Sequence, residues 1–255
     1  MLAPPGEPAR VFERHLRVAR DATSSVALLL WPEDTVDVSG DFAGSLPHER
    51  LAALASALDT LVVAGVVEEV EGSTQELRRF RNAAVVVDAD GQIQARYDKV
   101  LRVPFGEYVP WRSVVDRFAD LSLIPRDAVP GVGPGLLSTE RGDLGVTISY
   151  EVLFPSRARA AVRAGGELLL VPTNASSYAT DDVPSQQLAA ARLRAMETGR
   201  PVVMASPTGY SAVIAADGNI LARSELGVST LVRASVTPRV GATPYTRTGD
   251  TPVLV

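Results

Sequence analysis

The sequence predicts a layered α/β domain built on a mixed sheet. Three observations lead to this prediction: short apolar runs alternate with segments of helical periodicity, hairpins with Gly-containing turns join some of the runs, and no repeat or low-complexity linker divides the chain. The 255 residues, of which 46% are hydrophobic and 22% charged, can form a sizeable core. We therefore expect residues 1–255 to fold as a single domain.

The first half of the chain contains two predicted helices and several buried strands. Apolar residues recur every three to four positions over residues 8–20, which indicates a helix. Val26–Leu30 is wholly apolar and is followed by Pro32, which cannot donate to a strand ladder, so a buried strand ends here. The remaining elements of this half are a helix at His48–Leu58, a strand at Thr60–Val67, and a hairpin of Ala83–Val87 and Gln92–Tyr97 around the turn Asp88–Gly91.

The second half repeats the alternation of strand and helix. Apolar strands are predicted at Leu144–Ile148 and Glu167–Val171, separated by a helix at Ser156–Ala164. A long helix at Gln186–Thr198 ends at Gly199, a typical C-terminal residue. The last predicted strands are Val202–Ser206, Ser211–Ala215, Ile220–Arg223 and Leu231–Val236, with a hairpin turn at Ala216–Asn219.

Composition excludes several kinds of site. The chain has no Cys, so disulfides, thiolate metal sites and thiol nucleophiles are absent. Its two histidines, His15 and His48, lack ligand-like neighbours, so we expect neither a metal site nor a Ser-His-Asp triad, and no cofactor. A net charge of −5 without basic runs argues against nucleic acid as a partner. No apolar stretch has the length of a membrane helix, and Met1–Gly6 lacks signal-peptide features, so we expect the chain as it stands to be soluble.

Three polar residues follow predicted buried strands: Glu33, Lys99 and Ser149. Lys99 is also the only lysine among 25 basic residues. Unlike the planar, permanently charged Arg, Lys is a compact cation whose pKa responds to its surroundings. Polar groups at strand ends are where α/β sheets build sites, although each could instead be a helix-terminal, salt-bridging or capping residue.

Four strings, in this order, resemble the nitrilase (carbon-nitrogen hydrolase) superfamily: Trp31–Glu33, Tyr97–Pro110, Ile148–Pro155 and Pro172–Ser176. The second string resembles one branch in particular, the apolipoprotein N-acyltransferases. The resemblance runs from about Val11 to Asp250, nearly the whole chain. It implies a nitrilase-like α-β-β-α sandwich with mixed sheets.

The resemblance also implies roles for individual residues. In that family a Glu, a Lys and a Cys form the catalytic triad. Matching the strings places the general base on Glu33 and the cation that stabilises the oxyanion on Lys99, with Ser149 at the position of the nucleophilic Cys. Supporting or substrate-binding roles fall on Glu107, Tyr150, Glu151 and Asn174.

The activity implied by the resemblance is transfer of a fatty acyl group through an acyl-enzyme. The donor would be a phospholipid and the acceptor the N-terminal amine of a lipoprotein. The parent protein would lie in the cell membrane, with its catalytic domain on the extracytoplasmic face. A soluble amidase or carbamoylase of the same superfamily, and a catalytically inactive relative, are the alternatives.

Ser149 departs from the family pattern and leaves activity open. A serine hydroxyl is a far weaker acid than a Cys thiol, whose pKa is about 8.5, and it normally needs a His or Lys partner. Ser149 is natural to this lineage, or it is an engineered change, or Lys99 acts as the base in a Ser–Lys arrangement. The lack of Cys throughout the chain favours the first explanation.

The family's catalytic domain normally opens with a further strand and lies between membrane helices. We expect this chain to be a fragment that lacks that first strand and the flanking helices, through which the parent would contact the membrane. Val253–Val255 would be the first turn of the last membrane helix. A vacant groove beside Val26–Leu30 fits this expectation, whereas a finished sheet edge contradicts it.

Overall fold

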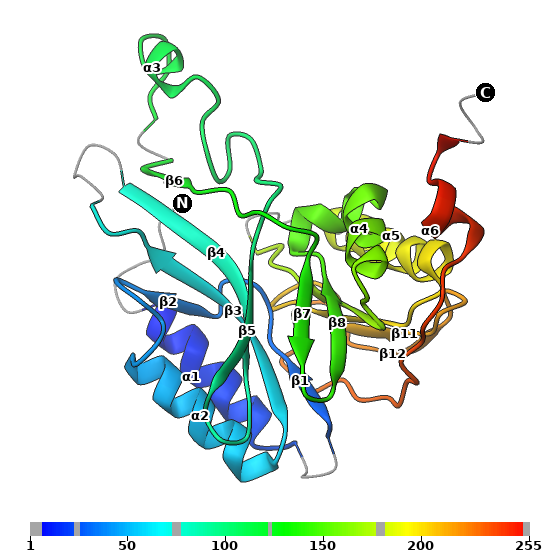
Figure 1. Cartoon of the computed structure of the whole chain (residues 1–255). Coiled ribbons are helices and arrows are strands. Elements are labelled where there is room, and N and C mark those ends of the chain that lie inside the picture. The colour runs from blue at the N-terminus through cyan, green and yellow to red at the C-terminus, as the bar shows by residue number, and fades with distance from the viewer. Residues whose placement is uncertain (1–6, 23–25, 73–77, 122–123, 177–181, 252–255) are drawn as a thin grey trace.

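The computed structural model of the chain describes residues 7–22, 26–72, 78–121, 124–176 and 182–251; Val253–Val255 lie outside these ranges. Two six-stranded sheets pack face to face, and helices cover the outer face of each (Figure 1). The predicted α-β-β-α sandwich with mixed sheets is therefore confirmed.

The first sheet and its helices come from the first half of the chain. The helices are α1 (Glu7–Ala19) and α2 (Leu46–Leu58), and the strands are β1 (Leu28–Leu30), β2 (Val36–Val38), β3 (Leu61–Glu69), β4 (Arg78–Val87), β5 (Ile93–Asp98) and β6 (Arg126–Ala128). The strand order is β1-β3-β4-β5, with β2 also paired to β3 and β6 to β4. Strands β1 and β2 run parallel to β3, whereas β4 runs antiparallel to both β3 and β5, so the sheet is mixed.

The second sheet has the order β12-β11-β10-β9-β8-β7. Its strands are β7 (Leu136–Thr139), β8 (Gly142–Val146), β9 (Leu168–Pro172), β10 (Val202–Ala205), β11 (Ala212–Ile214) and β12 (Ile220–Arg223). The other helical elements are α3 (Arg112–Val115), the 3₁₀ helix η1 (Ser149–Leu153), α4 (Pro155–Arg163), α5 (Asp182–Thr198) and α6 (Pro244–Thr248). No helix within the described ranges has the length and apolarity needed to cross a membrane.

Strand β3 shows why the buried runs lack a polar face. Val62, Ala64 and Val66 belong to the core formed with α1 and α2. Leu61 and Val63 point the other way, into the core between the two sheets. A strand covered on both faces reads as a continuous apolar run, and each such side chain contributes about 1.5–3 kcal/mol through burial.

The predicted strand at Leu231–Val236 is wrong. The segment forms no ladder, and its backbone makes no hydrogen bond to another described residue. Leu231 packs on the core beneath α1 and α2, and Val236 on the core between the sheets. A cavity separates the segment from β1. Its apolar residues are only partly buried, and the neighbour that a strand requires is missing.

Gly65 in β3 allows the chain to pass close to the sheet just after β1. A Cβ at this position would lie 2.4 Å from the Pro32 carbonyl oxygen and 2.5 Å from the Glu33 Cα. We expect Gly65→Ala to displace Glu33 and to lower the free energy of unfolding by about 1–3 kcal/mol, measured by urea denaturation. Gly40→Ala is the matched control, because a Cβ there meets no atom within 4 Å. Equal stabilities of the two variants would contradict this account.

Candidate active site

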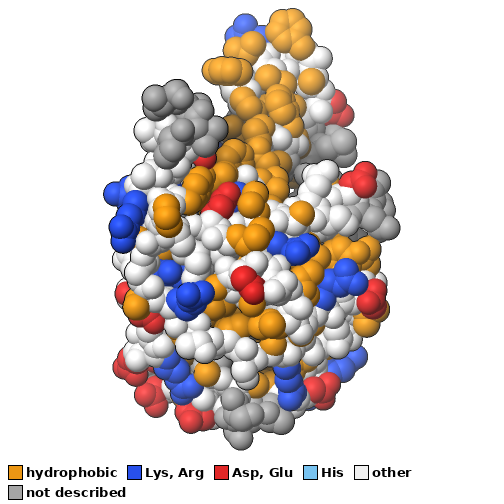
Figure 2. Space-filling model, turned by 90° about the vertical axis from the view of Figure 1, so that its right-hand side faces the viewer, with side chains coloured by type: hydrophobic (Ala, Val, Ile, Leu, Met, Phe, Trp, Pro, Cys, Tyr) orange, Lys and Arg blue, Asp and Glu red, His pale blue; other side chains and the backbone are white. Residues whose placement is uncertain are grey.

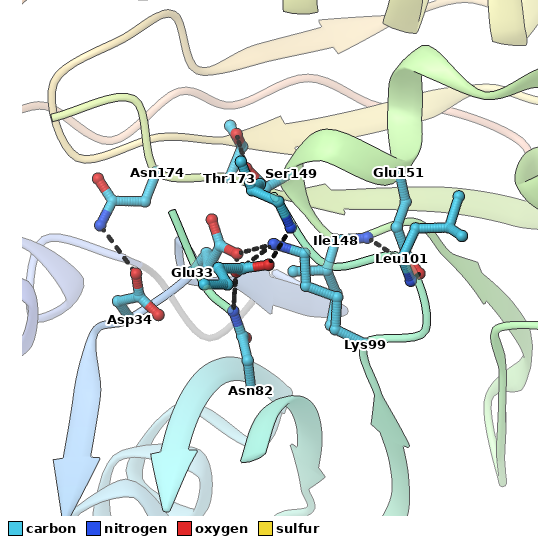
Figure 3. A network of polar contacts seen from close by, with 12 residues as sticks. Glu33, Asp34, Asn82, Lys99, Leu101, Ile148, Ser149, Glu151, Thr173 and Asn174 are labelled. Carbon is cyan, nitrogen blue, oxygen red and sulfur yellow. Dashed lines mark hydrogen bonds and ion pairs between the residues drawn. The ribbon is translucent and has the colours of Figure 1, made fainter. Parts of the chain in front are cut away.

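The polar residues predicted from the sequence meet where strands of both sheets end (Figure 3). Glu33 follows β1 and Lys99 follows β5 in the first sheet, whereas Ser149 follows β8 in the second. Glu33, Lys99 and Ser149 are all buried, with 4%, 2% and 6% of their surfaces exposed. The structure therefore brings the three predicted catalytic residues together between the sheets.

Lys99 lies between two carboxylates. Its Nζ donates to Glu33 Oε1 at 2.8 Å and to Glu107 Oε1 at 2.6 Å. Burial alone lowers the pKa of Lys99, but the charges of Glu33 and Glu107 outweigh it and raise that pKa above its ordinary value. Lys99 is therefore held as an ammonium, which disfavours the Ser–Lys alternative because a base must be unprotonated.

Asn82 fixes the orientation of both carboxylates, and the sequence reasoning missed it. Its Nδ2 donates to Glu33 Oε1 at 2.8 Å and lies 3.4 Å from Glu107 Oε1. The other oxygen of Glu107 accepts the backbone N–H of Val103 at 2.8 Å. The only sign of this role in the sequence is that Asn82 directly precedes the apolar run Ala83–Val87. In the structure, Asn82 and this run both belong to β4.

Ser149 occupies a strained turn at the start of η1. Its φ of +49° lies in the left-handed region, which non-Gly residues rarely adopt. The backbone N–H groups of Ser149 and Tyr150 have no acceptor among the described residues. These N–H groups are therefore available to an oxyanion formed beside Ser149.

Thr173 holds the Ser149 hydroxyl, and Gln187 orients Thr173. Thr173 Oγ1 lies 3.2 Å from Ser149 Oγ and 3.0 Å from Gln187 Oε1. A hydroxyl has one proton, and the Gln187 oxygen can only accept, so Thr173 donates to Gln187 and accepts from Ser149. The Ser149 proton thus points to Thr173 in this conformation, and it must turn away before another group can take it.

Glu151 organises the backbone on both sides of the site. It is fully buried, and its carboxylate lies 3.6 Å from Arg157 Nε. Its hydrogen-bond donors, at 2.8–3.0 Å, are the Tyr97 hydroxyl and the backbone N–H groups of Val100, Leu101 and Ile148. Glu151 therefore ties the loop after Lys99 to the turn that carries Ser149.

We expect Glu151→Gln to lower the free energy of unfolding by about 2–4 kcal/mol, because an amide has one acceptor oxygen and leaves buried donors unpaired. Urea denaturation measures the change. Glu140→Gln is the control, since the Glu140 side chain is exposed, and its effect should stay within about 0.5 kcal/mol. A Glu151→Gln variant as stable as this control would exclude the role given to Glu151.

The other two predicted residues lie at the margin of the network. The Tyr150 ring packs edge-on against Phe154, with the ring centroids 4.8 Å apart. Asn174 reaches across from the second sheet and donates Nδ2 to Asp34 Oδ2 at 3.1 Å (Figure 3). Sequence reasoning missed Asp34.

The described ranges contain no group of three or more His, Asp or Glu side chains placed to hold a metal ion.

A cavity of about 1590 Å³ opens onto the site. Glu33, Asp34 and Glu107 line one end of it, and the cavity extends past β1 to the segment 227–238. Its walls include apolar side chains from both sheets, such as Leu30. This volume exceeds the roughly 300–1,000 Å³ of ordinary small-molecule pockets.

An arm that contains Glu107 and α3 extends away from the sheets; we call residues 105–121 the apolar arm (Figure 1). Four of its exposed side chains are large and hydrophobic: Phe105, Trp111, Val114 and Phe118, which are 59%, 80%, 53% and 86% exposed. Figure 2 shows hydrophobic side chains covering the projecting part and continuing onto the body of the molecule. At the base of the arm, Arg112 pairs with Asp127 at 2.6 Å.

Comparison with known proteins agrees with this fold and sequence. The model of the carbon-nitrogen hydrolase family matches residues 11–245. The chain is 31% identical over 238 residues to an apolipoprotein N-acyltransferase of Mycolicibacterium smegmatis, covering 92% of this chain and 40% of that protein. It is 32% identical over 247 residues to the enzyme of that name from Geobacter metallireducens, covering 96% and 46%.

The chain thus spans less than half the length of these curated relatives. Among solved structures, a carbon-nitrogen hydrolase from Helicobacter pylori superposes with a TM-score of 0.63 at 20% identity, covering 85% of this chain and 80% of that one. That similarity supports the fold. With the family model matched from residue 11 to residue 245, the chain belongs to the carbon-nitrogen hydrolase family.

Proposed function

We propose that this chain is the catalytic domain of an apolipoprotein N-acyltransferase, which moves a fatty acyl group from a phospholipid to the N-terminal amine of a lipoprotein. The observation that carries the proposal is the apolar arm, which contains Glu107 of the ion-pair network of Lys99. A hydrolase of small amides has no need of exposed aromatic side chains beside its site. A lipid donor supplies an apolar partner for them.

In the first step, the Ser149 oxygen attacks the ester carbonyl of the phospholipid and Glu33 accepts the hydroxyl proton. The resulting oxyanion is stabilised by the Lys99 ammonium and by the free N–H of Tyr150. The intermediate collapses when the bond to the glycerol oxygen breaks, and that oxygen takes the proton from Glu33. The products are a lysophospholipid and an acyl ester on Ser149.

In the second step, the acceptor amine attacks the acyl ester. A carbon–nitrogen bond forms, the nitrogen gives a proton to Glu33, and the bond to the Ser149 oxygen breaks. Glu33 returns the proton to Ser149, which restores the site. The burial of Lys99 strengthens its interaction with the developing charge, because little water screens it.

The proposal predicts that the apolar arm binds lipid. Replacing Trp111 and Phe118 by Ser should weaken binding to phosphatidylcholine vesicles at least about tenfold, since each large side chain contributes about 1.5–3 kcal/mol when buried in lipid. Vesicle co-sedimentation measures the change. Val132→Ser is the control, because Val132 is 88% exposed but lies outside the arm. Equal loss from the control would exclude lipid binding by the arm.

The vacant space beside β1 supports the part of the proposal that makes this domain a piece of a longer protein. We further propose that the longer protein lies in the cell membrane, with its catalytic face outside the cytoplasm. β1 ends its sheet, and the cavity separates it from the unpaired segment Leu231–Val236. We infer that an extended segment outside residues 1–255 pairs with β1. In a longer protein, the amides of Val26–Leu30 should then exchange hydrogen more slowly than in this chain, and equal exchange rates would contradict the inference.

A transfer assay separates this function from its alternatives. The protein is incubated with a phospholipid carrying a labelled acyl chain and a diacylated lipopeptide with a free N-terminus, and Ser149→Ala is the control. We expect labelled amide with the parent chain and none with the control. Release of ammonia from small amides without acyl transfer would favour an amidase. No turnover of either substrate would favour a catalytically inactive relative.

A further inference from the structure

Asp34 is a carboxylate held at the site by the fold. Its φ of +59° lies in the left-handed region, at a cost of about 1–2 kcal/mol. The Thr35 hydroxyl fixes this turn by donating its proton between the Pro32 and Gly65 carbonyl oxygens, which lie 3.0 and 3.2 Å from Thr35 Oγ1. Asn174 donates to Asp34 from the opposite sheet (Figure 3). The side chain is thus positioned by both sheets beside Glu33.

Asp34 differs from its neighbours in having no cationic partner. Glu33 and Glu107 both pair with Lys99. Among the described residues, Asp34 receives one hydrogen bond, on Oδ2, and its Oδ1 has no donor. The buried Asn82 Oδ1 also lacks a donor, and both side chains line the cavity. Asp34 is exposed, so its Oδ1 is open to the cavity, whereas Asn82 Oδ1 is covered by other protein atoms.

The charge of the site favours a cation. Glu33, Asp34, Glu107 and Lys99 carry a formal charge of −2 when all are ionised, so a positive group gains from entering and a negative group does not. The acceptor of the transfer under "Proposed function" carries an α-amino group with an ordinary pKa of about 7.7–8.0, which is mostly an ammonium at neutral pH. An ammonium offers three donors, and the open Oδ1 of Asp34 can accept one of them.

We propose that Asp34 binds the α-ammonium of the acceptor and holds it beside the acyl ester on Ser149. This inference rests on the proposed acyl transfer. Before attack, the ammonium gives one proton to Asp34. The neutral amine then forms the carbon–nitrogen bond, and its second proton passes through Glu33 to the Ser149 oxygen as the ester bond breaks.

The protonation of Asp34 fits this exchange. Burial, and the charges of Glu33 and Glu107, raise the pKa of Asp34 to about 7, although Lys99 and the Asn174 hydrogen bond act to lower it. Asp34 is exposed to solvent, so burial contributes less to this shift than full enclosure would, and the neighbouring charges of Glu33 and Glu107 keep its direction upward. A proton can therefore pass between the α-ammonium and Asp34 at small cost. Binding of the cation should in turn release protons from Asp34 near pH 7.

Binding of two dipeptides tests the proposal without requiring catalysis. Alanyl-serine amide carries an α-ammonium as its only cation, and N-acetyl-alanyl-serine amide is the neutral match. NMR titration should show that the parent chain binds the first at least about tenfold more tightly than the second, and that Asp34→Asn removes this preference. Asp37→Asn, a change of the same kind in the same cavity, should keep it, because Asp37 pairs with Arg126 at 3.6 Å.

Equal binding of the two dipeptides by the parent chain, or a preference that survives in Asp34→Asn, would overturn the assignment. A kinetic measurement distinguishes acceptor binding by Asp34 from a purely structural role. Asp34→Asn should slow transfer to the amine but leave acylation of Ser149 by phospholipid unchanged, and equal slowing of both steps would also overturn it. If Ser149 is never acylated, the proposed function fails, while the dipeptide result still decides the role of Asp34.

Discussion

Replacing Lys99 by Met should lower the rate of acyl transfer by a factor of about 10²–10³, the cost of removing one group that stabilises an oxyanion. It should also lower the free energy of unfolding by about 3–5 kcal/mol at neutral pH, because Glu33 and Glu107 would remain buried without their cation. Transfer assays and urea denaturation measure the two effects.

The pH dependence identifies the cause of the lost stability. Without the ammonium, the two neighbouring carboxylates of the Lys99→Met variant repel each other, and protonation of either one relieves the repulsion. Such groups destabilise the fold when ionised and do so no longer when protonated. The variant should therefore recover stability relative to the parent chain as pH falls towards about 4. A constant difference between pH 8 and pH 4 would contradict the ion-pair account.

Lys99→Arg is the informative companion. The guanidinium keeps the charge, but it is a broad planar fork and Lys99 is 2% exposed in a space closed by two carboxylates. Compared with Lys99→Met, we expect Lys99→Arg to recover more of the lost stability than of the lost transfer rate. The oxyanion needs a compact donor at the position of the Lys99 ammonium. Full recovery of the rate would show that charge alone matters.

The second large effect is expected from Glu33→Gln, which keeps the shape of the side chain but removes the base. The transfer rate should fall by a factor of about 10²–10⁴, the usual contribution of a positioned general base. Lys99 keeps Glu107 as a partner, so the fold should suffer less than in Lys99→Met. Steady-state kinetics on the folded protein give the rate.

Glu68→Gln is a matched control for burial. Glu68 is 5% exposed, accepts the Phe42 N–H at 2.7 Å and pairs with Arg96 at 2.6 Å, away from the ion-pair network of Lys99. This variant should lose stability while its transfer rate per folded molecule stays unchanged. A similar loss of rate in Glu68→Gln and Glu33→Gln would mean that Glu33 acts only through the fold.

The sequence was informative where the chemistry lies within one continuous string. Lys99 and Glu107 are eight residues apart in a single string, and they form one ion pair in the structure. Glu33 and Ser149 follow apolar strands, whose ends meet between the sheets as α/β architecture requires. Local pattern and the rules of sheet packing together were enough to bring these residues to one site.

The residues that support the site could not be predicted in this way. Asn82 lies inside β4, and Gln187 lies in α5. Each becomes relevant only through the side chain it contacts from a distant part of the chain, and a single sequence does not record such contacts. The strand wrongly predicted at Leu231–Val236 has the same cause, because its apolar pattern says nothing of the neighbouring strand that a ladder requires.

The central claim is that Ser149 accepts an acyl group, and intact-protein mass spectrometry after incubation with a phospholipid tests it most directly. Without an acceptor, we expect the mass to rise by one acyl group, the added mass to map to Ser149, and no adduct to form on Ser149→Ala. Ser149→Cys should acquire the same adduct faster, since a thiol is the better nucleophile. An adduct on Ser149→Cys with none on the parent chain would contradict the claim and identify a site that has lost its chemistry.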